Sequence, residues 1–273
     1  MPVPVLSEPL NQTFSVRDIQ RSIVAIDWDA FTNRTITTAE VRLLGLVDLP
    51  SLVAIQKLTM HEVRLQSRTN AAVLIYEHPP VVTVGSQGNL LELPTDRREL
   101  QARLIDVHKV RRNGHAILHQ PGQLIASVIV SLPECSMDEH EFHQHLRDAV
   151  IKTCAEQQVT ARERAGDSTV IDGRHGIVAE IATGLDDGIT SFGVCLNVSC
   201  RLDEELAVGR AALGERISSL DAERVRPTPM PRVRASLIQH LCEGLGYPEY
   251  HIHTGHPFLK RTRVPVHDKS ADH

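Results

Sequence analysis

The residues best suited to chemistry gather in one segment, 111–124. It contains Arg111 and Arg112, an Asn113-Gly114 pair, a histidine at position 119 and a Pro121-Gly122 turn, and it lies between apolar stretches. Glycine lets a backbone come close to a ligand, and arginine and histidine can donate hydrogen bonds to it. A loop of this composition indicates a binding site, although an ordinary hairpin with surface charges fits the same residues.

Two histidines are candidates for proton transfer. His119 lies in the binding loop and could act as a base or as a hydrogen-bond donor to a ligand, or it could only stabilise the loop. His175 follows Arg174 and could carry a proton, although a surface turn explains it equally well. The three histidines at 251, 253 and 256 lack a carboxylate or cysteine partner, so a solvated tail fits them better than a metal site. We expect no metal and no other cofactor.

Composition excludes several classes of protein. A formal net charge of -5 gives no general attraction to nucleic acid or to anionic membranes. The five cysteines show no Cys-x-x-Cys spacing, which argues against disulfides and a zinc cage and favours a reducing cytoplasm. The longest apolar stretch, Leu124–Leu132, is far shorter than the roughly twenty residues that span a bilayer, and the N-terminus shows no signal-peptide pattern. We expect a cytoplasmic protein, monomeric and without membrane contact.

Three helices are predicted around the loop. Asp48 can cap a helix over Leu49–Ser67, and the run that begins at Ser136 has capping-box spacing for a second helix. The apolar face of the second helix consists of Phe142, Leu146, Ala149, Val150 and Thr153. A third helix follows the Pro-rich linker 226–231, with its apolar face at Val233, Leu237, Ile238, Leu241 and Leu245.

Six strands are predicted from apolar and alternating runs, at Ala72–Glu77, Val81–Val84, Leu104–Val110, Leu124–Leu132, Gly176–Thr183 and Ile189–Val198. Asp186-Asp187-Gly188 is a good hairpin turn between the last two. We divide the chain into an N-terminal extension, 1–38, with one possible strand at Ser22–Asp27, a domain at 39–245, and a His- and Pro-rich tail at 246–273 that is expected to be loosely packed.

Four segments, 41–48, 75–85, 111–124 and 193–198, resemble in the same order the octanoyltransferases of lipoate synthesis, relatives of lipoate and biotin protein ligases. That family writes its loop as Arg-Gly-Gly-x-x-Thr-Tyr-His-x-Pro-Gly-Gln-Leu, and this chain matches it at Arg112, Gly114, His119, Pro121, Gly122, Gln123 and Leu124. The likeness covers roughly residues 41 to 243. It implies an acyl-binding crevice between the loops 78–88 and 111–123, with ligand contacts from His78, Gly85, Arg112, Gly114, His119, Pro121, Gly122, Gln123, Phe192 and Asn197.

The resemblance also implies a cysteine that carries the acyl group as a thioester and a lysine that handles the proton. Neither is at the matching place: Ile177 stands where the lysine is expected, and no lysine occurs between Lys152 and Lys260. The segment 209–220, where the cysteine is expected, contains none. The binding segments also depart from the family at Ser86, Asn113, Ile117, Leu118, Gln120 and Phe192, where the family has arginine, glycine, threonine, tyrosine, glycine and histidine.

Cys200 is the thiol nearest to the missing one, and the positive charge of Arg201 beside it is expected to lower the pKa of the thiol. Cys200 as nucleophile, with His119 or His175 as base, is therefore one candidate catalytic set. Cys195 alternates with its neighbours inside a strand and is expected to belong to the core. Glu180 stands where the family has a small residue, and it is relevant to the site only if its side chain faces the pocket.

The fold implied by the resemblance is α+β, a mixed sheet with flanking helices, like that of biotin and lipoate protein ligases. Three functions remain open. The chain could transfer an octanoyl group from octanoyl-acyl carrier protein to the lysine of a lipoyl domain of a 2-oxoacid dehydrogenase or of the glycine cleavage H protein. It could be a catalytically silent paralogue that still binds an acyl chain, the carrier or the lipoyl domain. The third, an ATP-dependent ligase, is least favoured because those enzymes also use the missing lysine.

If the chain transfers an octanoyl group, or only binds the acyl chain, the carrier or the lipoyl domain, we expect Arg112 and His119 to reach the ligand. We expect both residues to contribute little to folding.

Overall fold

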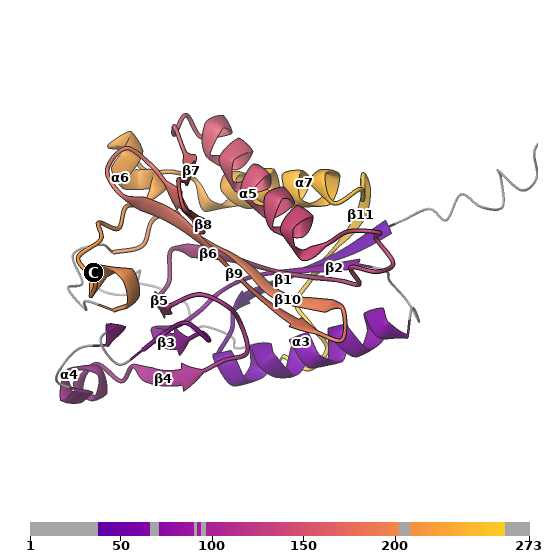
Figure 1. Cartoon of the computed structure of the whole chain (residues 1–273), viewed down its shortest axis with the longest axis horizontal. Coiled ribbons are helices and arrows are strands. Elements are labelled where there is room, and N and C mark those ends of the chain that lie inside the picture. The colour runs from indigo at the N-terminus through magenta and orange to yellow at the C-terminus, as the bar shows by residue number, and fades with distance from the viewer. Residues whose placement is uncertain (1–37, 66–70, 90–91, 94–96, 202–207, 260–273) are drawn as a thin grey trace, which may run out of the picture. The chain divides into compact units, whose positions relative to one another are not determined.

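An eight-stranded mixed sheet organises the part of the chain that the structure, a computed structural model, describes (Figure 1). The described residues are 38–65, 71–89, 92–93, 97–201 and 208–259. Residues 1–37 of the predicted N-terminal extension, with the possible strand Ser22–Asp27, lie outside them. The strand order is β11-β1-β2-β6-β10-β9-β8-β7, in which β1 runs parallel to β2 and β11 and the other pairs are antiparallel.

The strands of this large sheet are β1 (Thr38–Leu46), β2 (Ala71–Glu77), β6 (Gln123–Val130), β7 (Arg162–Arg164), β8 (Asp167–Asp172), β9 (Ile177–Asp186), β10 (Ile189–Asn197) and β11 (Glu249–Thr254). A small second sheet has the order β4-β3-β5, with β3 (Val81–Val84) parallel to β4 (Asp106–Lys109) and antiparallel to β5 (Ala116–His119). The mixed sheets with flanking helices confirm the predicted α+β class.

Helices cover both faces of the large sheet. On one face, α5 (Glu139–Glu156) packs beside α7 (Met230–Gly244), and on the other face lies α3 (Leu49–Arg64), with the small sheet beside it (Figure 1). The shorter elements are α4 (Arg97–Ala102), the 3-10 turn η2 (Gly209–Ala211) and α6 (Leu220–Arg224). Among the described residues no helix is long and apolar enough to cross a membrane.

The sheet has a separate apolar core on each face because successive strand residues point to opposite sides. Along β6, Leu124, Ala126 and Val128 belong to the core under α5 and α7, whereas Ile125 and Ile129 belong to the core under α3. Every residue of β6 is buried, so this strand is the centre of the fold. The segment 111–122, called the motif loop from here on, runs directly into β6 and is thereby anchored to a fully buried strand.

The predicted helix after Asp48 is confirmed. The carboxylate of Asp48 accepts a hydrogen bond from the Ser51 backbone nitrogen at 2.9 Å, and the helix ends at Arg64. The second helix also forms with the expected buried face, but the prediction that Ser136 caps it is wrong. Asp138 is the N-cap, and it exchanges hydrogen bonds with Glu141 in a capping box. Ser136 instead has a φ of 50° in the preceding turn.

The six predicted strands are all present, with shifts of a few residues at their ends. The largest change is in Leu104–Val110, which is reduced to Asp106–Lys109. Asp187 and Gly188 have φ values of 50° and 75°, as a two-residue hairpin turn requires. Sequence reasoning did not find β1, β5, β7 and β8. Nor is the whole tail loosely packed, because residues Glu249–Thr254 form β11 and pair with β1 along six residues.

The cap of α5 gives a test of the fold. Replacing Asp138 with alanine leaves the Glu141 backbone nitrogen without its side-chain acceptor, so the free energy of unfolding should fall by about 1 kcal/mol. Ser136→Ala is the matched control and should change it by much less, because Ser136 does not cap the helix. Urea denaturation of the two variants checks this, and equal losses would contradict the assignment of the cap.

Candidate active site

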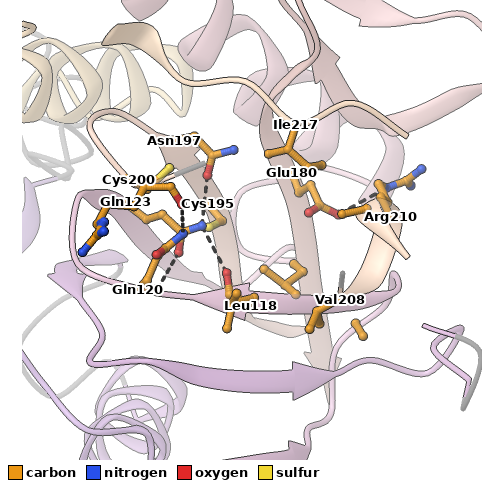
Figure 2. Close-up of a pocket in the computed structure, with 14 residues that line it drawn as sticks. Leu118, Gln120, Gln123, Glu180, Cys195, Asn197, Cys200, Val208, Arg210 and Ile217 are labelled. Carbon is orange, nitrogen blue, oxygen red and sulfur yellow. Dashed lines mark hydrogen bonds and ion pairs between the residues drawn. The ribbon is translucent and has the colours of Figure 1, made fainter. Parts of the chain in front are cut away.

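A cavity of about 100 Å³ opens between the small sheet, strands β9 and β10 of the large sheet, and η2 (Figure 2). Its apolar lining comes from Ile117 and Leu118 of β5 and from Val208 and Ile217. Its polar side chains come from Gln120, Gln123, Glu180, Asn197, Arg201 and Arg210, and Cys195 and Cys200 also face it. Figure 2 shows Glu180 and Arg210 toward one end and Gln120, Gln123 and Cys200 toward the other, with Cys195 between them.

Two amides fix the polar end of this cavity. The Nε2 of Gln123 donates to Leu118 O at 3.2 Å and to Oδ1 of Asn197 at 3.0 Å. Asn197 Nδ2 in turn donates to Ser218 O at 3.1 Å. Both side chains are buried, so their hydrogen bonds join β5, β6 and β10 at the cavity. The predicted residues Gln123 and Asn197 are therefore part of the site, where they hold its walls in place.

The loop glycines bring backbones together. A Cβ added at Gly85 would come within 2.4 Å of Gly114 O, so no larger residue fits between the loops 78–88 and 111–123. Gly122 has a φ of 91°, and its nitrogen donates to Oε2 of Glu77 at 2.9 Å. These contacts confirm that the two predicted loops pack on each other. Pro121 is exposed in the turn before β6 and does not line the cavity.

Arg112 is buried, with 4% of its surface exposed, and its guanidinium bonds to protein atoms. Its NH2 donates to Thr83 Oγ1 at 2.8 Å and to Thr83 O at 3.0 Å, and its NH1 donates to Asn113 O at 2.8 Å. A buried guanidinium requires such partners, because its unpaired donors would be costly. The expectation that Arg112 contributes little to folding is therefore wrong, whereas its contact with a ligand stays a prediction, since Arg112 also lines the groove along α3.

His119 is also buried, and both of its ring nitrogens have neighbours. Nε2 lies 2.9 Å from Thr83 Oγ1, and Nδ1 lies 3.9 Å from Cys195 Sγ. Burial lowers the pKa of His119 well below its usual value, and the positive charges that His78 and Arg112 can carry lower it further. The ring is therefore neutral at neutral pH and can accept a proton. Like Arg112, His119 is held in place by contacts with other protein atoms.

His78 packs against His119. Its Nδ1 donates to Val47 O at 2.5 Å, and its ring packs edge-on against those of His119 and Tyr76, with ring centroids 5.4 Å and 5.0 Å away. Desolvation lowers the pKa of His78, so it too is neutral. His78 thus makes structural contacts and lines the small void beside His119 and Cys195, and its contact with a ligand stays a prediction.

The two cysteines of the cavity differ from the sequence prediction. Burial raises the pKa of the Cys200 thiol to about 12, so the expected activation by Arg201 is wrong. No side-chain hydrogen bond involves the Cys200 sulfur in the described part of the chain. Cys195 lies in β10 and in the core under α3, as predicted, but it also faces the cavity beside His119.

A charged cluster closes the end of the cavity where the family pattern predicts the missing cysteine. Arg210 is 4% exposed, and its Nε lies 3.2 Å from Glu180 Oε2. Its other nitrogens contact Asp167 at 2.6 Å and Glu215 at 3.1 Å. Desolvation raises the pKa of Glu180, although Arg210 opposes that shift. Glu180 thus faces the pocket, which was the condition for a role of Glu180 in the site.

Two predicted residues lie elsewhere. His175 is exposed in the turn between β8 and β9, where its backbone nitrogen donates to Glu223 Oε1 at 2.9 Å, so the structure does not bring it to the cavity. Phe192 has a φ of 57°, unusual for an aromatic residue, and it lines a separate groove of about 760 Å³ along α3. Ser86 also lines that groove. Phe192 also lines the small void of about 20 Å³ that Cys195 and His119 line, so it borders both the groove and this void.

Sequence reasoning missed the roles of Thr83, Cys195 and Arg210. Thr83 is one residue of a predicted strand, and nothing in a single sequence shows that two motif side chains converge on it. Arg210 lies in the segment 209–220, where a charged residue stands next to apolar ones. This pattern was the signal that could have indicated a role for Arg210. In the described ranges no cluster of histidine, cysteine or carboxylate side chains could hold a metal ion.

Comparison with known proteins agrees with this architecture. Residues 52–242 match the lipoyl protein ligase A/B catalytic domain. The octanoyltransferase of Chloroflexus aggregans is 30% identical over 209 residues, which cover 75% of this chain and 94% of that protein. The octanoyltransferase of Roseiflexus sp. is 29% identical over 203 residues, 73% of this chain and 84% of the relative.

Solved structures show the same fold. The bi-partite lipoate protein ligase of Thermoplasma acidophilum superposes with a TM-score of 0.61 at 20% identity, over 80% of this chain and 88% of that one. A lipoate-protein ligase A bound with ATP gives a TM-score of 0.62 at 20% identity, over 80% and 90% of the two chains. The predicted lipoate ligase-like fold is confirmed.

The buried position of Arg112 gives a second test. Arg112→Ala leaves Thr83 O and Asn113 O without their donor, so the free energy of unfolding should fall by roughly 1 to 3 kcal/mol. Arg111→Ala, the exposed neighbour, is the control and should have almost no effect. Thermal denaturation of both variants measures the difference. A stable Arg112→Ala protein would show that this guanidinium is not structural.

The charged cluster gives a third test. Arg210→Met removes the partner of Glu180 and Asp167, so stability should fall by about 3 kcal/mol, the scale for breaking a buried ion pair. Adding Glu180→Gln to that variant should restore part of the loss, because one uncompensated carboxylate disappears. Arg216→Met, on the exposed side of the same segment, is the control. Additive losses in the double variant would contradict the pairing.

Proposed function

Because the chain belongs to the lipoyl protein ligase A/B catalytic domain family, we propose that it transfers octanoyl or lipoyl groups in protein lipoylation. The donor is an octanoyl thioester on acyl carrier protein, and the acceptor is the lysine of a lipoyl domain of a 2-oxoacid dehydrogenase or of the glycine cleavage H protein. The curated relatives that support this proposal are octanoyltransferases, and this chain spans most of their length.

One observation carries the proposal: the motif loop leads into a cavity with an apolar wall and a polar end. Ile117 and Leu118 offer a straight alkyl chain the contacts it needs. Gln123, Asn197 and Glu180 line the same space and make its other side polar. The cavity therefore offers an acyl chain an apolar surface beside polar side chains.

The proposal is tested by measuring the transfer of an octanoyl group directly. The purified protein is incubated with octanoyl-acyl carrier protein and a lipoyl domain, and the mass of the lipoyl domain is followed with time. We expect the domain to gain one octanoyl group, and a domain whose acceptor lysine is replaced by arginine to gain none. A protein that binds octanoyl-acyl carrier protein but never modifies the domain would contradict transfer and would be the silent paralogue instead.

A cavity-filling variant connects that activity to this site. Ile217→Trp places a large ring in the cavity and should slow transfer by at least about tenfold, which corresponds to a loss of 1.4 kcal/mol of transition-state binding. Leu213→Trp is the matched control, because Leu213 is exposed in the same segment and does not line the cavity. Equal rates in the two variants would place the acyl group somewhere else.

A further inference from the structure

A cysteine that lines the cavity, Cys195, also faces a histidine, His119. Cys195 comes from β10 and His119 from the end of β5, 76 residues apart in the chain, and Sγ lies 3.9 Å from Nδ1. Cys195 is 7% exposed, and it lines both the cavity and a small void of about 20 Å³ that also includes His119. A thiol beside a base and an open space is the arrangement that nucleophilic catalysis needs.

We propose that Cys195 is the nucleophile that carries the acyl group, with His119 as its general base. This inference rests on the proposed function and names the residues that perform it. The two would take the place of the cysteine and lysine that the family pattern predicts and that this chain lacks at those positions. Cys195 lines the same cavity as the motif residues Gln123 and Asn197, and His119 lines the small void on which Cys195 also borders.

The chemistry balances in two steps. In the first, Sγ of Cys195 attacks the carbonyl carbon of the carrier thioester while its proton passes to Nδ1 of His119. The carbon–sulfur bond to the carrier then breaks, and the carrier thiolate takes the proton from the imidazolium. In the second, the neutral lysine amine of the lipoyl domain attacks the Cys195 thioester. An amide forms, and Cys195 leaves as a thiolate that takes up the proton the amine loses, through His119.

His119 is oriented for this role by the residues behind it. Thr83 Oγ1 lies 2.9 Å from Nε2, and Arg112 donates to the same oxygen at 2.8 Å. If Nε2 carries the proton and donates it to Thr83, the lone pair of Nδ1 faces Cys195. The buried ring is neutral at neutral pH, as a base must be. Thr83 and Arg112 are thus positioning residues for the histidine.

The charges around Cys195 explain why a base is required. Desolvation raises the pKa of its thiol, and the carboxylate of Glu180, the residue paired with it on β9, raises it further. Arg112 acts in the opposite direction and favours the thiolate. The resting group is therefore a thiol that becomes nucleophilic only when His119 takes its proton. Cys200 lines the same cavity but has no such base beside its sulfur among the described residues, and it is the natural control.

The test separates the nucleophile from the overall function. The protein is incubated with octanoyl-acyl carrier protein and no lipoyl domain, and its mass and its cysteine-containing peptides are measured. We expect one octanoyl group in the wild type, and fragmentation of the peptide that carries it should place it on Cys195 and not on Cys200. Cys195→Ala should carry none and should lose at least about a hundredfold in the rate of transfer to a lipoyl domain. Its melting temperature and its binding of octanoyl-acyl carrier protein show whether it is folded.

A second variant addresses the base. His119→Asn removes the base, so acylation of Cys195 should slow by about a hundredfold or more, within the usual range for general-base catalysis. Thr83→Val removes the hydroxyl that orients the ring, so acylation should slow by a smaller factor, with kcat affected more than KM.

The outcomes are distinct. Transfer that continues in Cys195→Ala, or an octanoyl group found on Cys200 instead, would overturn the nucleophile and leave the proposed function intact. An adduct on Cys195 that no lipoyl domain can accept would support the nucleophile and overturn the transferase function. A wild-type protein that neither acquires an octanoyl group nor modifies the domain would overturn both.

Discussion

The guanidinium of Arg112 is the contact on which the rest of the site depends. By donating to the backbone and hydroxyl oxygens of Thr83 and to Asn113 O, it joins strand β3 to the motif loop. Thr83 then fixes the ring of His119 at the end of β5. A buried cation keeps this geometry because any movement that breaks one of these hydrogen bonds leaves a donor unpaired. The small sheet is thereby held in one position over the large sheet.

The second constraint is charge balance at the other end of the cavity. Arg210 brings a positive charge into a nearly buried position, and Glu180, Asp167 and Glu215 surround it. A buried cation without partners would be far more costly than this cluster. Burial raises the pKa of the Cys195 thiol, and the carboxylate of Glu180 raises it further, so the reaction depends on His119 to take up the thiol proton.

Much of the fold could be predicted from the sequence because its signals are local. Apolar periodicity identified α3, α5 and α7 and the central strands, and the motif residues identified the loop that forms the site. The cap of α5 was missed because Ser136 and Asp138 both precede the helix, and only backbone geometry separates them. Strand β11 was missed because its residues read as a polar tail, whereas its pairing with β1 uses backbone atoms.

The site was harder to predict because its decisive contacts join residues far apart in the chain. The strand pattern correctly indicated that Cys195 is buried, but it could not show that His119 faces it from another sheet. Arg112 fitted a ligand contact in the sequence, since an arginine in a glycine-rich loop usually points outward. Thr83, 29 residues earlier, supplies the acceptor that turns it inward. The family pattern located the loop correctly but could not indicate a nucleophile at a different position.

The central claim is that the space beside Cys195 holds the acyl chain, and chain-length dependence of binding tests it most directly. Calorimetry on the Cys195→Ala protein, which cannot react there, would compare octanoyl pantetheine with acetyl pantetheine. Each buried methylene contributes roughly 0.8 kcal/mol, so octanoyl pantetheine should bind more tightly by several kcal/mol. Equal affinities for the two compounds would show that no acyl chain is buried in this cavity, and would contradict the account.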